Sequence, residues 1–143
     1  MANQIFVNLP VKDLNRSVDF FTRLGSTFNP QFTDENATCM IIGENIYAML
    51  LVEDYFRTFT TREVIDAHQG IGSIIALSLD SREQVDDQIA KARAGGATIP
   101  REAQDLGFMY QHAFHDLDGH LWEVFYMDPS AVPHGPESEA IAS

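Results

Sequence analysis

The pattern of apolar and polar residues predicts a strand, a helix and three further strands in the first part of the chain. Residues 4–11 are rich in β-branched and aromatic side chains and contain a proline near their end, as a strand would. Asp13 is a suitable N-cap for a helix that Gly25 would end. The apolar residues of this helix recur at helical spacing, at Leu14, Val18, Phe21 and Leu24. Polar turns separate three shorter predicted strands, near 26–32, 37–42 and 46–52.

The same order of elements recurs about 68 residues further along the chain. A strand is predicted at 73–79, and Ser81 with Gln84 forms a capping box at the start of the next helix. Three more extended segments follow the Gly95-Gly96 stop, near 97–101, 107–115 and 120–126. The chain is therefore an internal repeat of two βαβββ modules.

This repeat predicts an α+β fold in which two tandem βαβββ modules form a half-open barrel with an interior cleft. One domain would span 1–127, with modules at about 4–52 and 72–127 and a partly helical connector at 53–71. Residues 128–143 are rich in proline and lack aromatic side chains, so we expect a flexible C-terminal tail.

Composition and charge narrow the class of partner. The 143 residues include 9 basic and 21 acidic side chains, giving a net charge of −12. Nucleic acids and anionic membranes are bound through clustered Lys and Arg, so neither is an expected partner. No apolar run reaches the roughly 18 residues that span a bilayer, and the start of the chain does not resemble a secretory signal. With Cys39 as the single cysteine, these features predict a cytoplasmic protein.

Three stretches, in this order, resemble the vicinal oxygen chelate superfamily. They run from Asn8 to Phe21, from Ile75 to Asp80 and from Asp116 to Val124. This superfamily includes glyoxalase I, bleomycin and fosfomycin resistance proteins and extradiol dioxygenases, and the likeness is greatest to short bacterial predicted lactoylglutathione lyases. The resemblance implies the fold, a small-molecule ligand and a homodimer. It does not imply one activity, because this fold serves several chemistries.

The resemblance also implies positions for a divalent metal such as Ni, Zn, Mn or Fe. Aligned on the helix starts, the first-strand position falls on Phe6 and the fifth-strand position on Ile74. The end of the first module, 48–52, contains no carboxylate or histidine, and only Glu123 on the last strand is a donor. A metal ion needs about three donors in one place, so the sequence favours a protein without the family's metal site.

His112 and Glu123 are the candidate catalytic residues. If the turn 116–119 joined a regular hairpin, these two residues would lie directly opposite each other. Three interpretations remain open: two tentative ligands of a rearranged metal site, an acid–base pair, or a hydrogen-bonded pair without chemical role. The expected cleft lining has a largely apolar character typical of small-molecule sites, and consists of Phe6, Asn8, Ile74, Ala76, Ser78, Tyr110, His112 and Glu123. His115 and His120 flank the turn and are expected to be exposed.

Three functions follow from these observations. The first is a protein of the superfamily that binds a small molecule in an apolar cleft without a conventional metal site. The second is an enzyme, either a metal-dependent lyase or dioxygenase with a rearranged site around Glu123 and His112, or a metal-free acid–base catalyst. The third is an interaction module whose cleft is filled by its own side chains. The apolar run 47–51, interpreted as a sheet edge, adds to the expectation of a homodimer.

Overall fold

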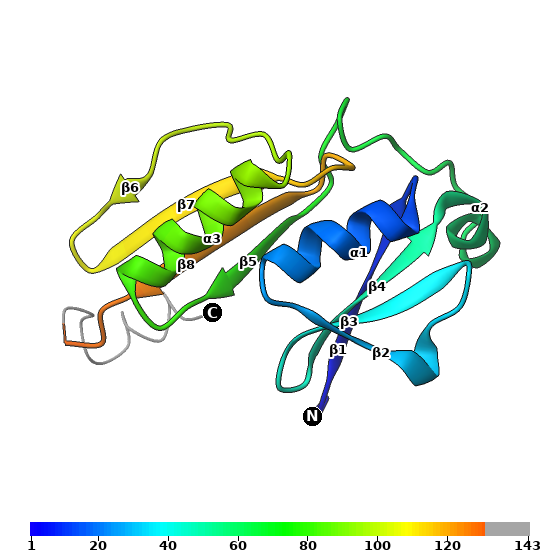
Figure 1. The fold of residues 1–143 in the computed structure, drawn as a ribbon, viewed down its shortest axis with the longest axis horizontal. Helices are drawn as coiled ribbons and strands as arrows, with labels where there is room; N and C mark the ends of the chain where they lie inside the picture. The colour runs from blue at the N-terminus through cyan, green and yellow to red at the C-terminus, as the bar shows by residue number, and fades with distance from the viewer. Residues whose placement is uncertain (131–143) are drawn as a thin grey trace.

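The computed structural model describes residues 1–130, and the sequence predicts their architecture well. The first module contains a four-stranded mixed sheet in the order β1-β4-β3-β2, with α1 on one face (Figure 1). Most of the C-terminal tail, 131–143, lies outside the described residues, so the prediction of a flexible tail stays a prediction. The elements of this module are β1 (Ile5–Val11), α1 (Leu14–Arg23), β2 (Thr27–Asn29), η1 (Pro30–Phe32), β3 (Ala37–Gly43) and β4 (Ile46–Val52).

The second module repeats this arrangement, with the sheet order β5-β8-β7-β6 and α3 on the same relative face. In each module the first strand, β1 or β5, pairs in parallel with the last strand, β4 or β8. The connector forms α2 (Glu53–Phe56) and the short helix η2 (Arg57–Phe59) and then continues without regular structure. The elements of the second module are β5 (Ile74–Ser78), α3 (Arg82–Ala94), β6 (Gln104–Asp105), β7 (Met109–His115) and β8 (Leu121–Met127).

Local sequence explains where the helices begin. The Asp13 side chain accepts a hydrogen bond from the backbone N–H of Arg16, at 3.1 Å, and so satisfies a free donor in the first turn of α1. Ser81 performs the same role for α3 by accepting from the N–H of Gln84. Both predicted N-caps are thus confirmed, and the Gln84 side chain accepts from the Asp80 N–H, at 2.9 Å, in place of the Ser81 N–H expected of a capping box.

Two strand predictions were wrong in detail. The segment predicted near 26–32 is a strand only to Asn29, because Pro30 begins a 3-10 turn. The segment predicted near 97–101 forms a single bridge, between Thr98 and His115, and the sixth strand lies later, at Gln104–Asp105. The run 47–51 is not a sheet edge, since β4 lies between β1 and β3.

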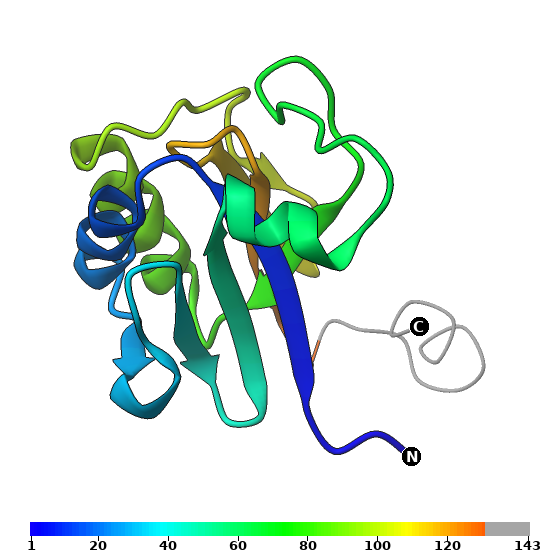
Figure 2. The ribbon, with the colours of Figure 1, turned by 90° about the vertical axis from the view of Figure 1, so that its right-hand side faces the viewer.

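The two modules share one core. Phe21 of α1 meets Trp122 of β8 edge-on at 5.4 Å, and Phe20 lies 6.0 Å from Phe114 of β7. Trp122 is 1% exposed, so the first helix is packed against the sheet of the second module. Figures 1 and 2 show α1 and α3 side by side on the same side of the molecule. The α+β class and the two modules are confirmed, and the sheets do not close into a barrel.

Each sheet therefore has one face that carries the long helix of its module, α1 or α3, and one that does not; we call the second the helix-free face. Two large apolar side chains on the helix-free faces, Phe6 and Ile74, are exposed. No helix among residues 1–130 is long and apolar enough to cross a membrane.

Candidate functional site

The register of the last hairpin separates His112 from Glu123. His112 pairs with Val124, and Ala113 takes the place opposite Glu123. The predicted pairing was wrong because the turn holds five residues, 116–120, instead of four: His115 pairs with Leu121. A shift of one residue moves a side chain to the other face of a sheet. His112 and Glu123 therefore do not form the pair on which the metal-site, acid–base and structural interpretations depended.

His112 and Tyr110 lie on the face that carries α3 and do not line a cleft on the helix-free side. His112 Nε2 donates a hydrogen bond to the backbone carbonyl of Arg101, at 2.9 Å. The Tyr110 hydroxyl donates to an Asp86 carboxylate oxygen of α3, at 2.6 Å, and this bond raises the pKa of the tyrosine. The Arg82 guanidinium lies 5.0 Å from the Tyr110 ring centre, which adds a cation–π contact. Tyr110 thus fastens α3 to β7, and His112 fastens to β7 the loop that follows α3.

The other predicted residues do lie on helix-free faces, although on two different sheets. On β1, Leu9 and Val11 are buried beneath α1, so Phe6 and Asn8 point to the opposite side. Phe6 stacks on Tyr47 at 4.7 Å and remains 47% exposed. On the second sheet the residues that share this orientation are Ile74, Ala76, Ser78 and Glu123.

The residues at the family's metal positions do not fit a divalent ion. Phe6 and Ile74 offer no donor atom, and the one carboxylate, on Glu123, receives Arg101 Nη2 at 3.3 Å. Within residues 1–130 no group of three His, Cys, Asp or Glu side chains is placed to hold a metal. A metal ion would need about three such donors together.

A pocket of about 310 Å³ lies where β1 meets the connector; we call it the connector pocket. Its lining is mainly apolar, with a few polar groups, the composition expected of a small-molecule site. Six of its lining residues come from β1, α2, the connector and the β7–β8 turn: Asn8, Pro10, Phe56, Ile65, Ile71 and His120. Asn8 is the one predicted binding residue among them.

His120 is a pocket residue that the sequence did not indicate. It is half-buried instead of exposed, and its Nε2 donates a hydrogen bond to the Pro10 carbonyl at 2.8 Å. This bond joins the turn of the second module to β1 of the first and fixes the imidazole at the wall of the connector pocket. His115 is also half-buried, because its Nδ1 meets the Gly119 carbonyl at 3.2 Å.

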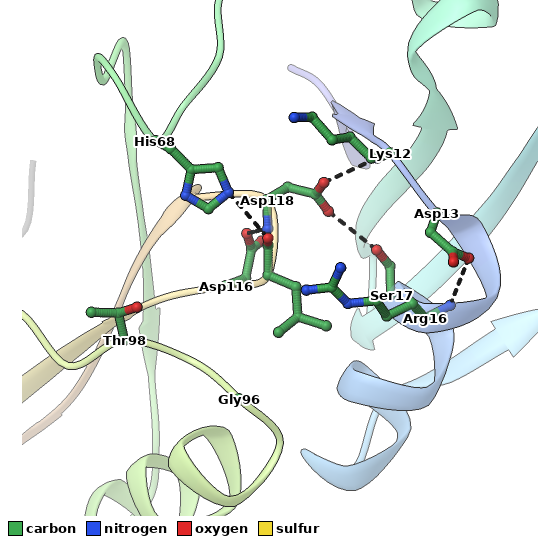
Figure 3. A pocket seen from close by; sticks show the side chains of 10 residues that line it. Lys12, Asp13, Arg16, Ser17, His68, Gly96, Thr98, Asp116 and Asp118 are labelled. Atoms are coloured by element: carbon green, nitrogen blue, oxygen red, sulfur yellow. Dashed lines mark hydrogen bonds between the residues drawn. The ribbon is translucent and has the colours of Figure 1, made fainter.

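A second, polar pocket of about 340 Å³ lies on the other side of the same turn (Figure 3). Asp118 accepts hydrogen bonds from the Lys12 backbone N–H at 3.0 Å and from the Ser17 hydroxyl at 3.3 Å. His68 Nε2 donates to the Leu117 carbonyl at 3.2 Å. These contacts join the last turn to the start of α1 and to the connector, so this pocket is a junction between the modules.

Comparison with known proteins agrees with the fold. A family model described as bleomycin resistance protein-like N-terminal matches residues 4–43. No curated protein matches the sequence. Together with the structural similarities below, the match confirms the resemblance to the vicinal oxygen chelate superfamily, at the level of its fold and N-terminal module.

Three solved structures illustrate the similarity. A hypothetical protein from S. aureus is 26% identical, with a TM-score of 0.75, and the match covers 88% of this chain and 95% of that one. A glyoxalase/bleomycin resistance protein/dioxygenase family enzyme from Burkholderia phytofirmans is 16% identical, with a TM-score of 0.73 and coverage of 88% and 99%. A fosfomycin resistance protein from Listeria monocytogenes is 18% identical, with a TM-score of 0.65 and coverage of 91% and 97%. At these identities the likeness establishes the fold and leaves the activity open.

Proposed function

We propose that the protein binds a small, largely apolar molecule in the connector pocket, without a metal of the family type. The observation that supports this is the composition of the pocket: its walls are mainly apolar, with Phe56, Ile65 and Ile71 among them, and Asn8, Glu63 and His120 are among its few polar groups. Small-molecule sites combine apolar walls with a few fixed hydrogen-bonding groups. The Pro10 carbonyl holds His120 in place, so little ordering of this side chain would accompany binding.

Thermal unfolding in the presence of a library of neutral aliphatic and aromatic compounds tests this proposal. A ligand at a hundredfold excess over its Kd would stabilise the folded chain by about 2.7 kcal/mol. Ile71→Glu puts a charge in the pocket wall and is expected to abolish this protection. Ile71 is 47% exposed, so the variant is expected to lose no more than about 0.5 kcal/mol of stability.

Leu106→Glu is the matched control, since Leu106 is 50% exposed and does not line the pocket. It should keep the full protection that a hit compound gives to the wild type. The proposal would be contradicted if no compound protected the wild type, or if a compound protected the Ile71→Glu variant equally well.

The alternative function, a metal-dependent lyase or dioxygenase around Glu123 and His112, depended on these two residues facing each other. They lie on opposite faces of the second sheet, so no observation in the structure favours it.

We place the protein in the cytoplasm because Cys39, its one cysteine, is 2% exposed and suited to a reducing compartment.

We also propose that two copies associate through their helix-free faces. Phe6 is 47% exposed on the helix-free face of the first sheet and Ile74 is 54% exposed on that of the second, so burial of these side chains would favour association. A two-fold pairing would bury the same faces of both copies. Light scattering at micromolar concentration should give twice the mass of the chain, and a monomeric mass would contradict the proposal.

A further inference from the structure

An open hollow of about 480 Å³ lies between α3 and β7; we call it the α3 groove. Helix α3 runs along the sheet of the second module, so the groove is on the face opposite to the helix-free face (Figure 1). A second hollow, of about 680 Å³, shares Arg93 and His112 with the groove, so these two side chains stand between the two. The residues that line the α3 groove are Asp86, Ile89, Ala90, Arg93, Ala94 and His112.

Arg93 supplies a positive charge that no acidic side chain neutralises. Among residues 1–130 its guanidinium makes no hydrogen bond or ion pair, although the chain has 21 acidic residues for 9 basic ones. Asp86, the carboxylate of the groove, already accepts the Tyr110 hydroxyl at 2.6 Å. A guanidinium presents five N–H donors in a fork that matches a carboxylate. The Arg93 side chain is therefore available to an anionic ligand.

His112 is fixed beside the groove with one ring nitrogen to spare. Its Nε2 donates to the Arg101 carbonyl at 2.9 Å, and within the described part of the chain its Nδ1 has no partner. With the Nε2 proton committed to this bond, Nδ1 presents a lone pair in the neutral ring and an N–H in the protonated ring. Arg101 itself is paired with Glu123. The other charged or titratable groups on the two hollows are Asp86, Arg93, Arg101 and Glu102, and Tyr110 lies two residues from His112 on the same face.

We propose that the α3 groove binds a small carboxylic acid with a compact aliphatic body. The Arg93 fork receives the carboxylate, protonated His112 donates to it from Nδ1, and the aliphatic part rests against Ile89 and Ala90. Ile89 is 4% exposed and forms an apolar floor, while the alanines leave room above it. The groove shares no lining residue with the connector pocket, so this site can fail or hold independently of the proposed function.

Two probes of nearly the same shape, 4-methylpentanoate and 4-methylpentanamide, differ in the charge that Arg93 would recognise. Titrations of the full-length protein followed by NMR, to about 10 mM, should show the acid binding about tenfold more tightly than the amide. Affinity for the acid should also increase as the pH falls from about 8 to about 6, because protonation of an imidazole adds a donor for the carboxylate. The amide should show no such increase.

Three variants assign these effects to the groove. Arg93→Gln is expected to bind both probes equally weakly, because the charge that distinguishes them is gone. His112→Gln should still prefer the acid but should lose the dependence of its affinity on pH. Ala90→Leu fills the groove with a good helix former on an exposed position of α3, so it should abolish binding of both probes while the protein stays folded.

Arg23→Gln is the matched control, because Arg23 occupies the last turn of α1 as Arg93 occupies that of α3. Both arginines interact favourably with the C-terminal end of a helix, so both variants lose that contribution. Arg23→Gln should bind both probes as the wild type does. The proposal is overturned if the wild type binds neither probe or does not prefer the acid. It is equally overturned if Arg93→Gln keeps the preference, if Arg23→Gln loses it, or if the pH dependence survives in His112→Gln.

Discussion

Gly119→Ala is expected to destabilise the protein by roughly 3 kcal/mol, because the added methyl group would overlap the backbone of the connector. A Cβ at this position would lie 2.6 Å from the His68 nitrogen and 2.7 Å from the Ala67 carbonyl carbon. These are main-chain atoms, which cannot rotate out of the way as a flexible side chain can. The connector would have to move away from the β7–β8 turn.

Gly107→Ala is the control that distinguishes the steric overlap at Gly119 from the backbone strain that an alanine with a positive φ causes by itself. Gly119 has a φ of +88° and Gly107 a φ of +84°, so an alanine at either position adopts a left-handed conformation that costs roughly 1 kcal/mol. The Cβ at Gly107 would meet nothing within 4 Å. Urea denaturation of both variants should show the larger loss for Gly119→Ala, and equal losses would mean that the connector is not seated on the turn.

Gly119→Ala and Gly107→Ala should also differ in their effect on the connector pocket. Ala67 and His120 both line it, and they lie on the two sides of the contact that Gly119 permits. A ligand found in the thermal screen should therefore protect Gly107→Ala and give weaker protection to Gly119→Ala. Because Gly119 has no side chain, the connector packs closely against the β7–β8 turn, and this contact supports one wall of the connector pocket.

The modules could be predicted from the sequence because their signals are local. Asp13 and Ser81 cap the two helices, and the apolar residues that follow them repeat at helical spacing, so each helix is specified by a few neighbouring residues. The family resemblance predicted that Phe6 and Glu123 would face a shared cleft, and the alternation of buried and exposed residues along β1 and β8 in the structure puts both on helix-free faces. Where position depends on one element alone, the sequence pattern was sufficient.

The register of the last hairpin could not be predicted in this way. Its turn contains Asp118-Gly119, a pair typical of tight turns, and this favoured a four-residue loop. The actual loop is one residue longer because the Asp116 N–H bonds to the His120 carbonyl and closes it there. That single residue decided which face His112 occupies. The connector pocket was also missed, because the connector beyond η2 has no periodicity from which its contacts could be inferred.

The second large effect is expected for Asp116→Ala, at about 3 kcal/mol or more of lost stability. Asp116 is 5% exposed, and its carboxylate accepts three hydrogen bonds. Oδ1 receives the backbone N–H groups of Asp118 and His120, at 2.9 and 3.0 Å, and Oδ2 receives Trp122 Nε1 at 2.9 Å. Removing the carboxylate leaves these donors without a partner in a region with little access to water.

Asp118→Ala is a useful control, because it removes a carboxylate from the same turn that is only half-buried. It would break the bonds to the Lys12 N–H and to the Ser17 hydroxyl, and water can replace the acceptor there more easily. We expect a loss of about 1 kcal/mol in urea denaturation. If the two variants lost the same stability, the burial of Asp116 would not be the source of its effect.

The pH dependence of the Asp116→Ala effect gives an independent check. Burial raises the pKa of Asp116 above its ordinary value of 3.8, despite the three donors, so the folded protein holds the proton more tightly than the unfolded chain. The stability linked to this proton is fully present below pH 3.8 and is lost as the pH rises through the higher folded pKa. The advantage of the wild type over Asp116→Ala should therefore shrink as the pH rises across this window. An advantage that grew with pH would mean that the three donors outweigh the burial of the charge.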